Sequence, residues 1–289
     1  MPARSLPVIA ALALLLAAPL RADTAAAAPV PETMAERGLK DIAEHQKVLF
    51  ADAAAQGTDL DEAGFKSQIE QLTHDYESLL RNNPDFAAGY ASYGYMLWKV
   101  GMRKPAVAIL LKANQMDPDI PLVKNELGNY LAEEGKPLEA LNYFLAAVKL
   151  EPKEPLYHFQ LGNLLYEARD DFLKSGEWSR AAIDHSMQEA FRNAAELAPG
   201  RIEFTYRYAE SFYDVKEPDW PAALKAWEDL DVRAQSQAER ETMRLHQVNV
   251  LLNMGKREPA RKLLDTLSDP TMAAQKKQLL DRMAADPAN

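Results

Sequence analysis

Three prolines at a fixed spacing constrain the fold of this chain more than any other feature. Pro84, Pro118 and Pro152 follow one another at intervals of 34 residues. A period of this length is typical of architectures built from repeated units, each of which buries its apolar face against its neighbours. Large and small residues recur at the same positions within each 34-residue unit. These residues are Tyr90, Tyr93, Gly94, Leu97, Ala106, Leu110 and Ala113 in the first unit and Lys124, Leu127, Gly128, Leu131, Ala140, Phe144 and Ala147 in the second.

The residue types within one period predict two antiparallel helices joined by a short turn. Gly101 and Gly135 occupy equivalent positions and suit the left-handed residue that ends many helices. Gly94 and Gly128 fall in the middle of the first helix, where glycine costs about 1 kcal/mol relative to alanine. Because this cost recurs at the same phase, we expect the two helices of each unit to cross closely there.

This pattern resembles the tetratricopeptide repeat (TPR), a 34-residue helix-turn-helix. The family motif runs from an aromatic residue through Leu-Gly, Tyr, Ala, Phe and Ala to Pro, and the segments LGNYL at Leu127 and LGNLL at Leu161 match it well. The resemblance implies an all-α fold, a right-handed superhelical solenoid of antiparallel helix pairs. The alternating segment IEFTYRY from Ile202 also fits a strand, but its phase places it in a first helix.

The pattern predicts the domain organisation. We expect a repeat array over residues 84–268, an N-terminal capping helix pair over 33–83, and a C-terminal capping helix and tail over 269–289. The third unit carries 13 extra residues near 166–186. We expect this insertion to lengthen both helices by about two turns, near 10 Å, as a hairpin with Phe172 and Trp178 near its tip. Such a hairpin either docks a partner or uses its aromatic residues only to hold itself together.

The first residues predict export. Arg4 precedes the apolar segment LPVIAALALLLAAPL, and small residues follow it, which is typical of a signal peptide over residues 1–22 that is cleaved after Ala22. The rival interpretation is an uncleaved anchor, although a spanning helix usually needs about 20 apolar residues. The composition of residues 23–32 predicts a disordered linker. We therefore expect a periplasmic or secreted protein with no membrane span in the mature chain.

Composition excludes several function classes. The chain has no cysteine, which rules out disulfides, thiolate catalysis and cysteine-ligated metals. The net charge is −10, which disfavours binding to nucleic acid and to anionic lipid. The five histidines have no metal-binding spacing, and no phosphate-binding loop or nucleophile elbow is present. We expect no catalytic residue, no metal and no cofactor.

The resemblance also predicts a binding groove, because the first helix of each TPR unit lines the concave face. Asparagine can donate to and accept from the backbone of an extended peptide, and Tyr and Trp add large contact areas. Glu210 and Asp214 could take a Lys or Arg of the ligand. Alternatively, these aromatic residues only pack on adjacent helices and the asparagines are merely solvated. The predicted groove residues are Tyr95, Trp98, Asn125, Asn129, Phe159, Asn163, Tyr166, Tyr206, Glu210, Tyr213 and Asn249.

The resulting hypothesis is a non-catalytic scaffold or adaptor of the cell envelope that binds a protein or peptide in this groove. A ligand with a free C-terminal carboxylate is disfavoured, because Lys99 is the only nearby base among the positions that the resemblance to the TPR family places on the concave face. Two alternatives stay open. The groove could bind a glycan or metabolite, with or without catalysis, or the chain could be a structural protein that self-associates through its open ends.

Overall fold

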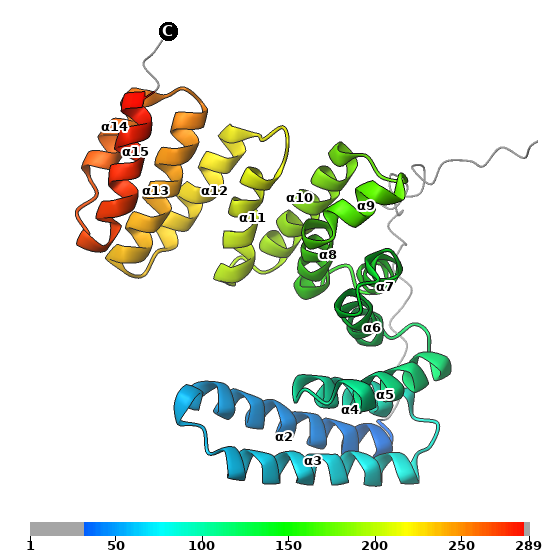
Figure 1. Cartoon of the computed structure of the whole chain (residues 1–289). Helices are drawn as coiled ribbons and strands as arrows, with labels where there is room; N and C mark the ends of the chain where they lie inside the picture. Colours follow the sequence, from blue (N-terminus) through cyan, green and yellow to red (C-terminus); the bar gives the residue numbers. More distant parts are fainter. Residues whose placement is uncertain (1–31, 286–289) are drawn as a thin grey trace, which may run out of the picture. The chain divides into compact units, whose positions relative to one another are not determined.

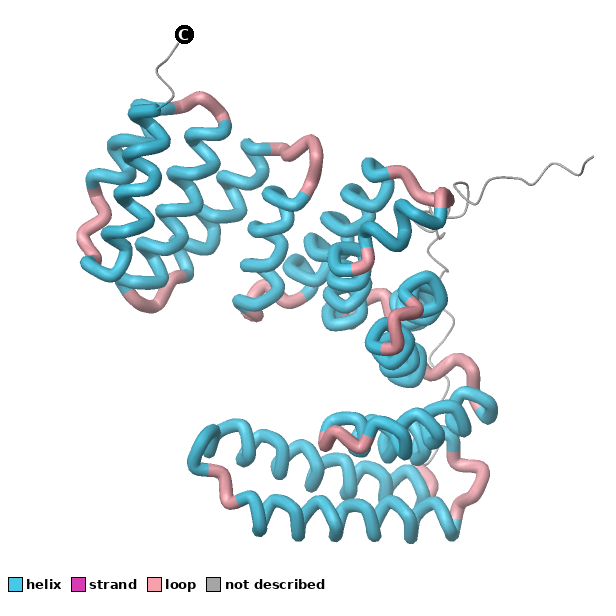
Figure 2. The backbone as a smooth tube through the Cα atoms, viewed as in Figure 1, coloured by secondary structure: helices cyan, strands magenta, loops and turns pink. Residues whose placement is uncertain are grey.

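The computed structural model describes residues 32–285, and within this range all regular elements are helical. Fourteen α-helices and two short 3-10 helices follow one another without a strand among these residues (Figures 1 and 2). The all-α prediction is therefore confirmed. The expected signal peptide and nearly all of the expected linker lie outside the described residues.

The chain divides after Pro118 into two compact units, which are described separately. In the N-terminal unit, Thr33 and Glu36 form a reciprocal capping box that starts the first described helix. The Tyr76 hydroxyl donates to Gln46 Oε1 at 2.7 Å and ties two helices together. The helices of this unit are α2 (Met34–Gln56), η1 (Gly57–Asp59), α3 (Glu62–Asn82), α4 (Ala87–Lys99) and α5 (Arg103–Met116).

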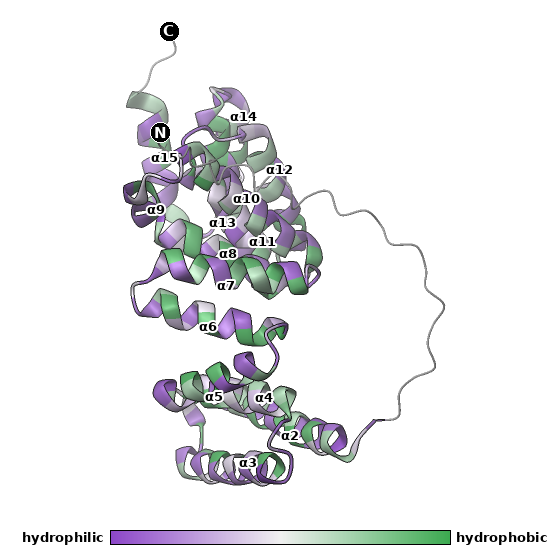
Figure 3. Ribbon diagram, turned by 90° about the vertical axis from the view of Figure 1, so that its right-hand side faces the viewer, coloured by the Kyte–Doolittle hydropathy of each residue, from purple (hydrophilic) through white to green (hydrophobic). Residues whose placement is uncertain are grey.

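The C-terminal unit contains four antiparallel pairs, α6/α7, α8/α10, α11/α12 and α13/α14, and α15 contacts α13. Most helices carry both hydrophilic residues, purple in Figure 3, and hydrophobic residues, green in the same figure. The helices of this unit are α6 (Pro121–Glu133), α7 (Pro137–Leu150), α8 (Pro155–Glu167), α9 (Arg169–Ser175), α10 (Arg180–Leu197), α11 (Ile202–Asp214), α12 (Trp220–Arg233), α13 (Gln237–Asn253), α14 (Arg257–Asp265), η2 (Pro270–Met272) and α15 (Ala273–Ala285).

Close helix crossing explains the mid-helix glycines. A Cβ atom at Gly94 would lie 2.7 Å from Leu110 Cγ, and one at Gly128 would lie 3.1 Å from the ring of Phe144. Neither distance leaves room for a methyl group without displacement of the partner side chain. Gly101, in the turn between α4 and α5, has a φ of +80°. The predicted close approach and the predicted left-handed turn are both confirmed.

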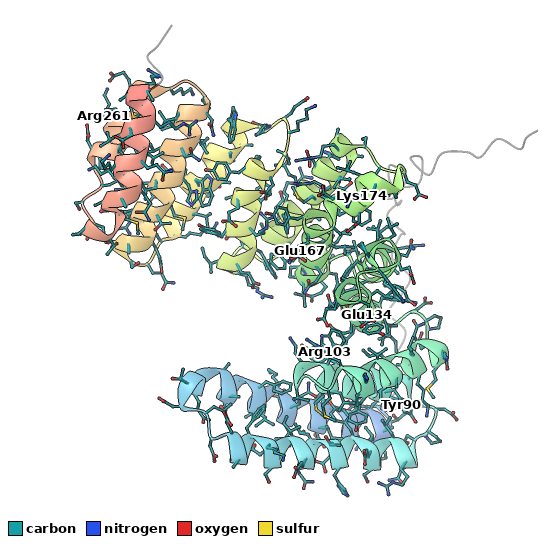
Figure 4. All side chains as sticks on the ribbon, in the orientation of Figure 1. Tyr90, Arg103, Glu134, Glu167, Lys174 and Arg261 are labelled. Carbon is teal, nitrogen blue, oxygen red and sulfur yellow. The ribbon has the colours of Figure 1, made fainter. Side chains whose placement is uncertain are left out.

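The insertion folds differently from the expectation. Helix α8 is not lengthened, because the chain bends at Ala168 and continues as the short α9. Phe172 of α9 is fully buried and packs edge-on against Trp178, with ring centroids 6.0 Å apart. Lys174 lies on the exposed side of α9 (Figure 4). The predicted protruding tip is therefore wrong, since the bend buries the apolar face of α9 against α7, α8 and α10.

Within residues 32–285, no helix combines the length and the apolar composition that are needed to cross a membrane.

Candidate peptide-binding site

An open pocket of about 400 Å³ lies between α8 and α11 in the C-terminal unit. Three predicted groove residues, Phe159, Tyr206 and Glu210, meet there. The other three, Ile202, Glu203 and Arg207, were not predicted from the sequence, although Glu203, Tyr206, Arg207 and Glu210 have the spacing of one helix face. The residues that line this α8–α11 pocket are Phe159, Ile202, Glu203, Tyr206, Arg207 and Glu210.

Phe159 forms the apolar part of the pocket from α8. Its ring lies 4.7 Å from that of Phe204 on α11 and 5.9 Å from that of Phe191 on α10, as centroid distances. Phe191 and Phe204 are fully buried. These packed rings fix Phe159, so the pocket has a preformed aromatic wall.

Tyr206 is held in place by a buried aromatic stack. Its ring packs edge-on against Trp227 at 5.1 Å, and its hydroxyl lies 3.2 Å from His246 Nε2. Burial lowers the pKa of His246 to about 4, so the imidazole is neutral at neutral pH. Burial also raises the pKa of Tyr206, with Glu210 acting in the same direction. The two side chains are therefore neutral hydrogen-bonding partners.

Tyr213 belongs to the same stack. Its hydroxyl donates to the backbone oxygen of His246 at 3.3 Å, and its ring lies 5.9 Å from that of Trp220. Burial raises the pKa of Tyr213 to about 12. Tyr213 is thus engaged in internal packing and does not line the α8–α11 pocket, although the prediction placed it in the groove.

Arg207 has its charge compensated within the fold. Its guanidinium lies 4.3 Å from the ring centroid of Tyr166 and 4.5 Å from that of Phe191. It also makes an ion pair with Asp214 at 2.8 Å, in which both side chains are largely buried. Tyr166 remains 40% exposed and extends the aromatic surface along α8. Asp214 is consequently occupied by Arg207.

Glu210 differs from its charged neighbours. It is half-buried at the pocket and makes no ion pair or hydrogen bond with another described residue. Burial raises the pKa of its carboxyl group, Arg207 opposes this shift and Asp214 reinforces it. A carboxylate in this position is an acceptor that lacks a donor.

Most of the predicted asparagines already have partners. Asn125 is fully buried and donates to Glu126 Oε1 at 3.0 Å, while Asn129 donates to Glu126 Oε2 at 3.3 Å. Asn249 accepts from Arg282 Nη1 of α15 at 2.5 Å. Asn163, four residues after Phe159 on α8, is half-buried and makes no hydrogen bond through its amide with the described residues. It is the predicted asparagine that is best placed to hold a ligand.

The two predicted groove residues of the N-terminal unit, Tyr95 and Trp98, also contact cationic side chains of the same unit. Trp98 is only 7% exposed, and the Arg103 guanidinium covers its ring, 3.9 Å from the ring centroid. Trp98 therefore has almost no surface to offer to a partner, contrary to the expectation that it is a groove anchor. Tyr95 is half-buried, with Lys99 Nζ 5.4 Å from its ring centroid.

The described residues contain no group of three or more His, Asp or Glu side chains that could hold a metal ion. The α8–α11 surface presents aromatic rings, the amide of Asn163 and the carboxylate of Glu210.

Comparison with solved structures identifies the fold. No family model and no curated protein matches the sequence. The structure is similar to that of YrrB, described as a TPR protein with an unusual peptide-binding site, with a TM-score of 0.52 and 17% identity over 73% of this chain and 95% of that one. Pseudomonas aeruginosa PilF matches with a TM-score of 0.51 and 16% identity over 84% and 99% of the two chains.

PilW, described as a widely conserved type IV pilus biogenesis factor, matches with a TM-score of 0.50 and 12% identity over 83% of this chain and 98% of that one. Sequence identities this low carry no information on ligand or pathway. Together the three likenesses establish that the chain has the α-helical solenoid fold of the tetratricopeptide repeat proteins.

Proposed function

We propose that the protein is a non-catalytic interaction scaffold that binds a polypeptide segment at the surface formed by α8 and α11. The observation that carries this proposal is the α8–α11 pocket, where Phe159, Tyr206 and Glu210 meet in an open hollow. Tyr166 and Asn163 continue the same face of α8, since they follow Phe159 at helical spacing. An extended peptide would find aromatic anchors and one free amide for its backbone along this line.

We propose further that residues 1–22 export the protein to the periplasm or the exterior, which the apolar segment after Arg4 supports. In this organisation, residues 33–83 and 269–289 cap the two ends of the repeat array. The bend of α9 into the core does not support the alternative of a docking knob in the insertion. The fully buried Phe172 has no surface to offer a partner.

A peptide-display selection tests the binding function without knowledge of the partner. Residues 23–289, which retain every described residue, are used to select clones from a library of random peptides about 16 residues long, enough to span the two helices when extended. Ile202 lies on the pocket rim and is 57% exposed, whereas Val232 on α12 is 86% exposed and does not line the pocket. Aspartate at either position leaves the core unchanged, so Val232→Asp is a matched control for Ile202→Asp.

We expect the selected peptides to lose about tenfold or more in affinity for Ile202→Asp, which corresponds to about 1.4 kcal/mol. Affinity for Val232→Asp should stay within about twofold of that for the unchanged chain. Peptides that bind both variants equally well would place the binding site elsewhere. A selection that yields no binding peptide would favour a small ligand or self-association over this proposal.

A further inference from the structure

Among the charged residues that line the α8–α11 pocket, Glu210 is the one without an ion pair to a described residue. Arg207 is paired with Asp214 at 2.8 Å, and Glu203 is paired with Arg201, also at 2.8 Å. Glu210 makes no ion pair among the described residues and is half-buried at the pocket wall. A partly desolvated carboxylate gains most from a cationic donor, because charge-assisted hydrogen bonds are about twice as strong as neutral ones.

The rest of the pocket wall also suits a planar cation. Phe159 and Tyr206 present aromatic rings, which attract a guanidinium group placed over their faces. The same unit already uses this contact internally, since Arg201 lies 4.0 Å from the ring centroid of Phe204. The exposed Ile202 at the rim offers an apolar surface for an aliphatic stem.

Another contact in the C-terminal unit shows that a predicted groove position accepts a guanidinium. Arg282 of α15 donates to Asn249 Oδ1 at 2.5 Å and to Asn253 Oδ1 at 2.6 Å. In addition, the acidic excess of the chain, a net charge of −10, favours the approach of cationic segments.

We propose that the α8–α11 pocket takes one arginine side chain of the bound polypeptide, with its guanidinium on Glu210 and between the rings of Phe159 and Tyr206. This inference rests on the proposed function, because it names the side chain that the same surface recognises. Arginine is preferred to lysine since its planar group both stacks on aromatic rings and donates two parallel hydrogen bonds to a carboxylate.

The test compares three peptides that differ at one side chain. The probes are acetyl-Gly-Leu-Arg-Leu-Gly-amide and its analogues with citrulline, which has the same shape without charge, and with lysine. Binding to residues 23–289 is followed by amide chemical-shift changes in NMR titrations. The matched variants are Glu210→Gln and Glu228→Gln, which neutralise the pocket carboxylate and an exposed carboxylate on α12 that does not line the pocket.

We expect shifts at the pocket residues and an affinity for the arginine peptide about tenfold or more above that for the citrulline peptide, with lysine between them. Glu210→Gln should reduce this ratio to about one, and Glu228→Gln should leave it unchanged. A ratio near one in the unchanged chain, a ratio that survives Glu210→Gln, or tighter binding of lysine overturns the inference.

The failure of this inference and that of the proposed function give different results. Equal binding of the arginine and citrulline peptides at the pocket removes the preference for arginine and leaves peptide binding intact. Absence of shifts with all three peptides also overturns the arginine site. Whether the proposed function fails with it is then decided by the display selection, which samples peptides of every composition.

Discussion

The indole ring of Trp227 lies parallel to the imidazole of His246, with centroids 3.9 Å apart and an interplanar angle of 4°. Trp227 is fully buried, and the hydroxyls of Tyr206 and Tyr213 lie 3.2 and 3.5 Å from the two imidazole nitrogens. This stack connects α12 with α13 and holds Tyr206 at the edge of the α8–α11 pocket. The order of the proposed binding site therefore depends on a neutral histidine.

The stack predicts a pH-dependent stability. Burial lowers the pKa of His246 to about 4, from an ordinary value of 6.5. The unfolded chain therefore binds a proton at this residue between these pH values and the folded chain does not, so the free energy of unfolding decreases as the pH falls. We expect this residue alone to remove on the order of 2–3 kcal/mol between about pH 7 and pH 4.

Urea unfolding at a series of pH values measures this loss. His246→Phe keeps an aromatic ring against Trp227 and removes the titrating group. We therefore expect the loss of unfolding free energy on acidification to be about 2–3 kcal/mol smaller in this variant than in the unchanged chain. The remaining histidines and carboxyl groups are common to both proteins and cancel in the difference. Identical pH dependence of the two proteins would contradict the assignment to His246.

Trp98 and Tyr166 should respond oppositely to truncation, although both were predicted groove residues. Trp98 is buried beneath Arg103, so Trp98→Ala should destabilise the fold by about 3–5 kcal/mol. Tyr166 is 40% exposed, and Tyr166→Ala should cost at most about 1 kcal/mol of stability while weakening peptide binding by about 1–3 kcal/mol. Thermal unfolding and titration with a selected peptide measure both effects. Full stability of Trp98→Ala would show that its ring is not part of the core.

Asp184 should hold the insertion to the rest of the C-terminal unit. Its carboxylate accepts from Arg180 Nε at 2.7 Å and from the backbone N–H of Lys216 at 3.0 Å, and it lies 3.4 Å from Arg169 Nη2. Because the side chain is largely buried, Asp184→Asn leaves two arginines undercompensated and should cost about 3 kcal/mol.

Asp171→Asn is the control for this prediction. Asp171 on α9 is exposed and its carboxylate lies 4.0 Å from Lys174 Nζ, so its neutralisation should change stability by less than about 0.5 kcal/mol. Chemical denaturation of the two variants gives the comparison. Similar stability of the two variants would show that the buried network does not contribute.

Gly162 provides a test of the close helix crossing. A Cβ atom there would lie 2.7 Å from the ring of Phe191, which is fully buried. Gly162→Ala should therefore destabilise by about 1–3 kcal/mol, although alanine favours a helix by about 1 kcal/mol. A Cβ atom at Gly200 would meet no other atom within 4 Å, and Gly200→Ala should stay within about 0.5 kcal/mol. A stabilising effect at Gly162 would mean that α8 and α10 cross less closely.

The helix pairs could be predicted because the residues that define them act locally. A glycine at position 94 or 128 is required by the helix that crosses it, and this requirement repeats with the period of the chain. The bend at Ala168 could not be predicted in the same way. Phe172 continues the apolar face of α8 whether the helix extends or turns, and only the available space against α7 and α10 favours the turn.

The candidate site was predictable where the position on the helix decides exposure, as for Phe159, Tyr206 and Glu210. It was not predictable where a distant side chain occupies the position. Arg282 donates a hydrogen bond to Asn249, which lies 33 residues earlier in the chain. Arg207 forms its ion pair with Asp214, and Glu210 has none with a described residue. Such pairings depend on tertiary geometry and have no signature in the periodicity.

Site-specific photo-crosslinking tests directly whether a bound peptide lies at the α8–α11 surface. The photoreactive residue benzoylphenylalanine replaces Ile202 at the pocket rim or Val232 on α12, both of which are exposed. After illumination with a selected peptide, we predict a crosslinked product for the variant at position 202 and none for the variant at position 232. Crosslinking at 232 with none at 202 would contradict binding of a polypeptide at the α8–α11 surface.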